Sequence, residues 1–195
     1  MPKINLIQFH EIIASPDFQE ILEIITSFEN KEEVSYFFEA AFSEKEIENF
    51  KNRWQAVKWI GQEDLTYREI IKRTGLSSTI LQRARNRLFD PSYEWDFFLK
   101  KSKGLNVDPL QELFEILSLI NNKKEIEFFF SNALTRTEVY HFSKRWQVVK
   151  MIRDEIPYRT ISKETDVALS TVHLIAKSLK ENTGWNLALE NLNKE

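Results

Sequence analysis

The 195-residue sequence contains no cysteine, only four glycines and only five prolines. The absence of cysteine excludes disulfide bonds and thiolate metal sites, and it is typical of proteins from a reducing compartment. Because glycine and proline are scarce, few residues favour tight turns, and helices are the preferred structure. We therefore expect an all-helical protein located in the cytoplasm.

Other absences exclude whole classes of function. Charged residues interrupt every apolar run, so no stretch approaches the roughly 18 apolar residues of a membrane-spanning helix. The segment from Met1 to Ser15 lacks the basic and apolar regions of a secretion signal. The three histidines are isolated, and the sequence has neither a glycine-rich phosphate loop nor a histidine–glutamate metal motif. We therefore predict no membrane association, no metal site and no enzymatic activity.

The most informative feature is an internal repeat. Residues 17–63 match residues 109–155 with 19 identities in 47 ungapped pairs, far above chance. After the loss of one residue, residues 65–88 continue against residues 156–179. The polar segment around Gly104 is typical of a linker. The sequence therefore predicts two domains, residues 1–100 and residues 101–195.

Within each copy, apolar residues recur at the three- and four-residue spacing of amphipathic helices. The second helix of the first copy is predicted from Lys31 to Ala41. Capping boxes at Ser43–Glu46 and Thr135–Glu138 predict the beginning of each third helix. Trp54 and Trp146 lie on the apolar stripes of these third helices, and we expect both to be buried.

A helix-turn-helix is predicted between Thr66 and Leu88. Thr66 and Glu69 form a capping box, Gly75 suits a left-handed turn, and Ser77 or Ser78 can cap the following helix. The second helix of such a motif offers its first residues to the major groove of DNA.

The chain has a net charge of -3, so any DNA contact requires a local positive patch. The predicted motif supplies one, because six positive residues face a single acid, Glu69. The positive residues are Arg68, Lys72, Arg73, Arg83, Arg85 and Arg87. Ser77, Ser78 and Thr79 suit close contact with phosphates and base edges, and the Gln82 amide matches adenine.

The second copy keeps the outline of the motif with weaker chemistry. Asp166, Ala168 and Leu169 replace the glycine and the two serines of the first turn, and four positive residues face two acids. We therefore expect the first copy to dominate DNA binding. Leu169 is interpreted either as a thymine-methyl contact or as a residue of the core or of a protein interface. The remaining candidates for groove contacts are Ser170, Thr171 and His173.

The two copies share several short sequence motifs. In the second copy these motifs are Arg145 to Lys150, Tyr158 to Ile161, Ser170 to Val172 and Gly184 to Leu187. In the first copy they are Arg53 to Gln55, Thr66 to Ile70 and Thr74 to Ser78. These motifs resemble the Trp repressor superfamily, in particular its YerC/YecD-like branch. The resemblance covers nearly the whole chain from about Asp17. It implies six-helix subunits that normally entwine in pairs and bind operator DNA. We therefore expect a monomeric, intertwined pseudo-dimer that binds double-stranded DNA as a repressor, with a higher oligomer as the alternative.

The resemblance also assigns positions. The implied DNA contacts are Arg68, Lys72, Ser77, Ser78, Thr79 and Gln82, followed by Arg159, Lys163, Ser170 and His173. Two arginines hold the amino-acid ligand in Trp repressors, and similar positions here are Arg53 and Arg83, but Arg145 and Leu174 in the second copy. We expect no cofactor, with a tryptophan-responsive repressor as the alternative. Arg53 is then an ion-pair partner of an acid such as Glu46 or Glu48, and Arg83 is a phosphate contact.

The rival interpretation from another class is a protein-interaction module with a degenerate helix-turn-helix. Aromatic residues could anchor such a partner, although we favour packing between the copies. These residues are Tyr93, Trp95, Phe97 and Phe98.

Overall fold

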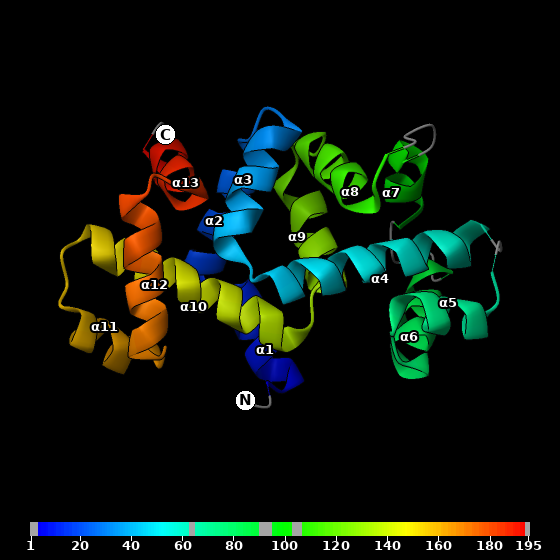
Figure 1. The fold of residues 1–195 in the computed structure, drawn as a ribbon, viewed down its shortest axis with the longest axis horizontal. Helices are drawn as coiled ribbons and strands as arrows, with labels where there is room; N and C mark the ends of the chain where they lie inside the picture. The colour runs from blue at the N-terminus through cyan, green and yellow to red at the C-terminus, as the bar shows by residue number, and fades with distance from the viewer. Residues whose placement is uncertain (1–3, 63–64, 90–94, 103–106, 194–195) are drawn as a thin grey trace. The chain divides into compact units, whose positions relative to one another are not determined.

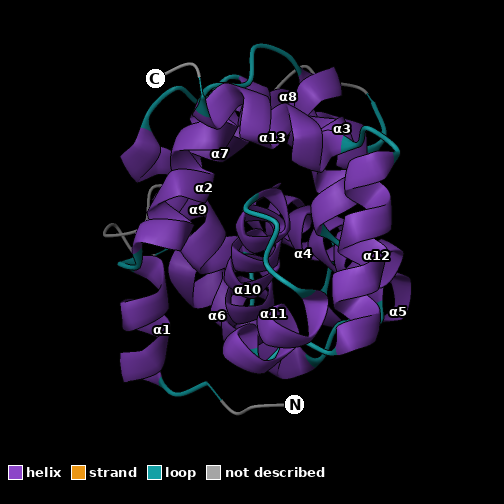
Figure 2. Ribbon diagram, turned by 90° about the vertical axis from the view of Figure 1, so that its left-hand side faces the viewer, coloured by secondary structure: helices purple, strands orange, loops and turns teal. Residues whose placement is uncertain are grey.

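The computed structural model describes residues 4–62, 65–89, 95–102 and 107–193, and each regular element in these ranges is an α-helix (Figures 1 and 2). The helices of the first half are α1 (Leu6–Ile13), α2 (Pro16–Thr26), α3 (Lys31–Ala41), α4 (Glu44–Gln62), α5 (Tyr67–Thr74), α6 (Ser78–Leu88) and α7 (Trp95–Ser102). Those of the second half are α8 (Pro109–Ser118), α9 (Lys123–Ala133), α10 (Arg136–Arg153), α11 (Tyr158–Thr165), α12 (Leu169–Lys180) and α13 (Gly184–Leu192).

The order of helices reproduces the internal repeat. Helices α2 to α7 and helices α8 to α13 form two sets of six that correspond one to one, and α1 precedes the first set. The all-helical fold and the tandem arrangement predicted from the sequence are therefore confirmed. Helix α1 was not predicted, although Asn5 and Gln8 form a capping box at its start. That pairing is a local signal that could have revealed the helix.

The chain divides into two compact units that do not follow the boundary between the copies. The terminal unit consists of Met1–Glu44 and Leu117–Glu195, and the middle unit consists of Lys45–Ile116. The terminal unit thus combines α1 to α3 of the first copy with α9 to α13 of the second. The middle unit combines α4 to α7 of the first copy with most of α8. This exchange of helices confirms the predicted intertwined arrangement.

Aromatic side chains from both copies form the core of the terminal unit. The Phe142 ring of α10 lies 4.6 Å from the ring of Phe42, 6.0 Å from that of Phe37 and 5.9 Å from that of Phe130. Trp146 of α10 stacks at 6.2 Å on Trp185 of α13. Such aromatic packing supplies large buried area, so the N-terminal helices of the first copy are held against the second. The predicted burial of Trp54 and Trp146 is also confirmed.

Polar contacts repeat the same exchange in each unit. In the terminal unit, Glu20 of α2 accepts hydrogen bonds from Trp146 Nε1 at 2.9 Å and from Lys150 Nζ at 2.6 Å, both on α10. The internal repeat aligns Glu20 with Glu112 and Lys150 with Lys58. In the middle unit, Lys58 Nζ of α4 lies 2.5 Å from Glu112 Oε2 of α8. Each unit therefore joins equivalent helices from opposite copies through the same pair of residue types.

No helix within the described part of the chain combines the length and the apolar character that crossing a membrane requires.

Candidate nucleic-acid interface

The first helix-turn-helix lies in the middle unit, and local signals in its sequence define both helices. The Thr66 hydroxyl accepts from the Glu69 N–H, and Glu69 Oε2 in turn accepts from the Thr66 N–H at 2.8 Å. Gly75 ends α5 with φ of 68°, a left-handed conformation in which glycine carries no steric penalty. Ser77 caps α6 by accepting from the Ile80 N–H. The predicted caps and the predicted turn are confirmed.

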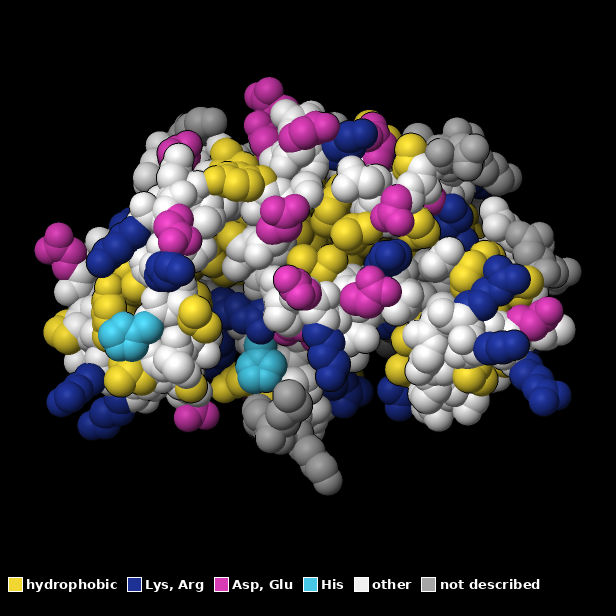
Figure 3. Space-filling view, viewed as in Figure 1, with side chains coloured by type: hydrophobic (Ala, Val, Ile, Leu, Met, Phe, Trp, Pro, Cys, Tyr) yellow, Lys and Arg dark blue, Asp and Glu magenta, His cyan; other side chains and the backbone are white. Residues whose placement is uncertain are grey.

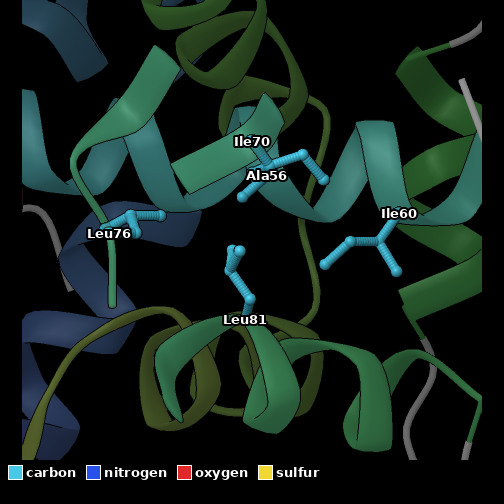
Figure 4. Close-up of a cluster of buried hydrophobic side chains, with 5 residues drawn as sticks. All are labelled: Ala56, Ile60, Ile70, Leu76 and Leu81. Atoms are coloured by element: carbon cyan, nitrogen blue, oxygen red, sulfur yellow. The ribbon is translucent and has the colours of Figure 1, made fainter. Parts of the chain in front are cut away.

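A small apolar cluster holds the two helices in place on α4. Ile70 of α5, Leu76 of the turn and Leu81 of α6 point toward Ala56 and Ile60 of α4 (Figure 4). Ile70 and Leu81 are fully buried. Burial of side chains of this size contributes about 1.5–3 kcal/mol each. The orientation of α6 is thus set by packing against the longest helix of the unit, which gives the motif a rigid support.

The positive side chains of this motif lie on its surface. Arg68, Lys72, Arg73, Arg83 and Arg85 are all exposed, and the side chain of Arg87 lies outside the described residues. Figure 3 shows Lys and Arg side chains on the surface of α5 and α6. Among the described residues, no carboxylate lies within ion-pair distance of Arg68, Lys72 or Arg83. Their charges are consequently available to an external anion.

Glu69, the single acid of the motif, is hydrogen-bonded within its own helix cap. The hydroxyl of Thr66 donates to Glu69 Oε2 at 2.7 Å. Hydrogen bonds from the hydroxyl and the backbone N–H of Thr66 lower the pKa of Glu69 below its ordinary value of 4.5. The ionised carboxylate therefore sits at the N-terminus of α5, where the helix dipole offsets its charge. The surface presented by this motif remains strongly positive.

The residues expected to reach base edges are also accessible. Ser77, Ser78, Thr79 and Gln82 are exposed in the first turns of α6. Gln82 donates a hydrogen bond to Asn86 at 2.9 Å, which fixes the direction of its amide. A second N–H and the carbonyl oxygen of that amide remain available, the pair of groups that matches adenine.

The second helix-turn-helix, formed by α11 and α12 in the terminal unit, is built with weaker caps. Pro157 and Ala168 precede the two helices, and neither supplies a side-chain capping bond. Asp166 occupies the left-handed position with φ of 59°, where a non-glycine residue is strained. Ser162 instead secures the turn by donating to the Val167 carbonyl at 2.7 Å. The predicted loss of capping in the second copy is confirmed.

The exposed face of α12 differs in character from that of α6. Ser170 and His173 are exposed, and the His173 ring makes an edge contact with Tyr158 at 5.1 Å, whereas Thr171 is half-buried. Leu169 is 37% exposed and Leu174 is 66% exposed. Leu169 therefore does not belong to the core. The exposure of Leu174 was not anticipated, because the sequence pattern alone does not tell which side of α12 faces the solvent.

The basic residues of the second motif are accessible as well. Arg159 and Lys163 of α11 are both exposed. They occupy the positions of Arg68 and Lys72 in the first motif. Each motif therefore places an arginine and a lysine, four residues apart, on the helix that precedes its recognition helix.

The arginines aligned with the ligand-binding positions differ in burial and in position within the fold. Arg145 Nη1 donates to the carbonyl of Ala41 at 2.7 Å and so satisfies the C-terminal end of α3. Arg53 is half-buried on α4, and Arg83 is exposed on α6. Glu48 forms an ion pair with Lys51 at 3.5 Å. Within the described residues, no cluster of three or more histidine or acidic residues could hold a metal ion.

The aromatic residues considered as a protein anchor are covered only in part. Phe98 of α7 is buried in the middle unit. Tyr93 lies outside the described residues, as do the side chains of Trp95 and Phe97. Phe98 is therefore removed from the candidate anchor, because a buried ring offers no surface to a partner protein.

Comparison with protein families gives one result. The family described as "Trp repressor protein" matches twice, over residues 16–103 and residues 108–193. The chain belongs to the Trp repressor family. Searches of curated proteins and of solved structures gave no match.

Each Trp repressor match spans one set of six helices, which confirms the tandem duplication. The family consists of DNA-binding helix-turn-helix regulators, so the chain is a DNA-binding regulator in this general sense. Its members are not enzymes, in agreement with the predicted lack of catalytic motifs. The assignment to the YerC/YecD-like branch stays a prediction.

Proposed function

We propose that the chain is a sequence-specific transcriptional repressor that inserts α6 and α12 into the major grooves of one operator. The observation that carries the proposal is the exposure of three cations of the first helix-turn-helix, Arg68 and Lys72 on α5 and Arg83 on α6. Phosphate contacts fix the register of a protein on DNA, and base edges then specify the sequence. The exposed Ser78, Thr79 and Gln82 supply groups for that second task.

The proposal includes a single chain as the binding species, located in the cytoplasm. A pseudo-dimer supplies two recognition helices without subunit association, because both copies lie on one polypeptide. Sedimentation at low micromolar concentration is expected to give a monomer of 23.2 kDa. An obligate dimer under these conditions contradicts this part of the proposal.

Selection of bound duplexes from a random pool, followed by measurement of affinity against salt, tests the proposed function. Each phosphate contact contributes about 0.9 to the slope of log affinity against log salt. The double substitution Arg68→Ala and Arg83→Ala is therefore expected to reduce the slope by about 1.8.

A matched control is the double substitution Lys45→Ala and Lys124→Ala, which removes the same charge from exposed positions of α4 and α9. We expect this control to retain the slope of the wild type. Equal slopes for the two double variants refute the assignment of the patch, and a pool that yields no bound duplex refutes the function.

An interaction module for another protein is the second candidate, favoured by the exposed Leu169 and Leu174 of α12. Apolar interfaces respond little to salt, whereas phosphate contacts respond steeply. Binding of a protein with unchanged affinity between low and moderate salt, together with no duplex binding, supports this alternative.

A tryptophan-responsive repressor is the remaining alternative, with Arg53 and Arg83 as the only complete pair of arginines at the ligand positions. Our proposal includes no corepressor. Addition of L-tryptophan is therefore expected to leave duplex affinity unchanged, and an increase in affinity that is lost with Arg53→Ala favours the alternative.

A further inference from the structure

The two helix-turn-helix motifs differ mainly in their recognition helices. Between α5 and α11, five of eight aligned residues are identical, including the pairs Arg68–Arg159 and Lys72–Lys163. Between α6 and α12, one of eleven aligned residues is identical, Leu88 with Leu179. Two of the basic side chains suited to phosphates are thus shared, whereas Arg83 and the side chains suited to bases have changed.

Two of the changes on the exposed face replace a polar side chain with an apolar one. Ser78 of α6 aligns with Leu169 of α12, and Arg83 aligns with Leu174, so two polar positions have become leucines. All four side chains are exposed, and both leucines lie within the first two turns of α12. These turns are the part of a recognition helix that reaches base edges.

Resting on the proposed function, we infer that the two motifs read different half-sites and that α12 recognises thymine through Leu169 and Leu174. In the major groove, the thymine methyl group is the apolar feature of a base edge, and an apolar side chain is its natural contact. The operator is therefore asymmetric, with a half-site for the polar face of α6 and a thymine-containing half-site for α12.

The surroundings of the leucines favour DNA over a protein as the occupant of this face. Ser170 and His173 lie between the two leucines in sequence, and exposed cations lie nearby on α11 and at the end of α12. These cations are Arg159, Lys163, Lys177 and Lys180, of which Lys177 pairs with Glu181 at 3.5 Å, and they outnumber the exposed acids of the motif, Glu164 and Asp166. Figure 3 shows hydrophobic and positive side chains together on the surface of this motif. Single apolar groups among cations match a methyl group set among phosphates, whereas protein interfaces bury apolar patches with few charges at the centre.

Helix geometry places the two leucines apart from one another. Leu174 follows Leu169 by five positions, which corresponds to about 7.5 Å along the helix axis and about 140° around it. The two leucines are thus expected to contact two separate thymines. Burial of one methyl group corresponds to about a fourfold change in affinity.

Replacement of thymine by deoxyuridine tests the inference, because it removes the methyl group and leaves the base-pairing edge intact. Selected duplexes would carry deoxyuridine at each thymine of one half-site, and affinity would be measured for the full chain. We expect about a fourfold loss at each of two positions in the half-site of α12. The double variant Leu169→Ser and Leu174→Ser should bind thymine and deoxyuridine duplexes equally.

Three controls separate the outcomes. Deoxyuridine in the half-site of α6 should affect the wild type and the leucine variant to the same extent. Since both leucines are exposed, unchanged thermal melting of the leucine variant would show that folding is intact. The variant Ser170→Ala should keep its sensitivity to deoxyuridine.

The failures are also distinct. A pool without bound duplexes refutes the proposed function and the inference with it. Tight binding without methyl sensitivity, or leucine variants that remain sensitive, refutes the inference alone. Selected duplexes with a single half-site, unaffected by the leucine substitutions, also refute it.

Discussion

The substitution Gly184→Ala tests how closely the second copy packs on the first. Gly184 begins α13, and a Cβ atom built on it lies 2.2 Å from the Tyr36 carbonyl oxygen and 2.4 Å from Phe37 Cα of α3. Both contacts are with backbone, which cannot turn aside as a side chain can. Ordinary contact begins at about 3.4 Å, so α13 would have to move by more than about 1 Å.

The expected cost follows from what this movement disturbs. Trp185 is fully buried next to Gly184, and its ring lies 5.6 Å from that of Phe37 and 6.2 Å from that of Trp146. Overpacking of a filled core costs about 1–3 kcal/mol. A glycine-to-alanine change also lowers the conformational entropy of the unfolded chain, which stabilises the folded state by about 0.4–1 kcal/mol. We therefore expect the free energy of unfolding to fall by up to about 2.6 kcal/mol.

Gly61→Ala is the matched control, because the same change meets a different environment. The Cβ atom there would contact Leu99 and Leu88 only at the ends of their side chains, and these can shift. Gly61 lies within α4, where alanine favours the helix by about 1 kcal/mol. Urea denaturation should therefore give a lower midpoint for Gly184→Ala and an equal or higher midpoint for Gly61→Ala. Equal midpoints for the two variants would refute the close packing of α13 on α3.

Three further predictions concern the motif support, the polar contacts and the linker. Leu81→Ala opens the cluster of Figure 4 and should lower the free energy of unfolding by about 2–5 kcal/mol, as measured in urea, with exposed Ser78→Ala as control. Burial is the largest influence on Asp17 and raises its pKa, but hydrogen bonds from Lys150 and Gln147 and the nearby charges outweigh it and lower the pKa below 3.8. The stability that this lowered pKa contributes is present above pH 3.8 and is lost as pH falls further, so Asp17→Asn should differ most from the wild type near neutral pH and least in strong acid. Cleavage at a protease site inserted between residues 103 and 106 should give fragments that fold only when mixed, because each compact unit contains helices of both copies. A fragment that shows a cooperative unfolding transition on its own would contradict this last expectation.

Local features of the fold could be predicted from the sequence because their causes lie within a few residues. The capping boxes at Thr66 and Thr135 each satisfy backbone groups of the same turn, and Gly75 supplies the left-handed conformation that ends α5. Helix α3 begins and ends at the predicted residues. The exposed cations of the first motif were likewise predictable, since they follow from the composition of a short segment.

Contacts between the copies could not be predicted, because their partners are distant in the sequence. Lys150 contacts Asp17 and Glu20, and nothing near Lys150 in the chain identifies these acids. The close approach of Gly184 to α3 likewise depends on how α13 crosses a helix of the other copy. The exposure of Leu174 follows from the packing of α12, whose buried side lies against α10, α11 and α13.

Because the two copies are covalently linked, their recognition helices can differ in sequence while the residues that join the copies stay the same. In a homodimer, any substitution appears in both recognition helices, so the operator must be symmetric. On one chain, Ser78 can remain polar while Leu169 becomes apolar, because each helix has its own codons. The residues that join the copies are under the opposite constraint, since Glu20 and Glu112 must each meet a lysine of the other copy. The identity of these joining residues and the divergence of the recognition helices are therefore both expected if the chain reads two unlike half-sites, as we propose.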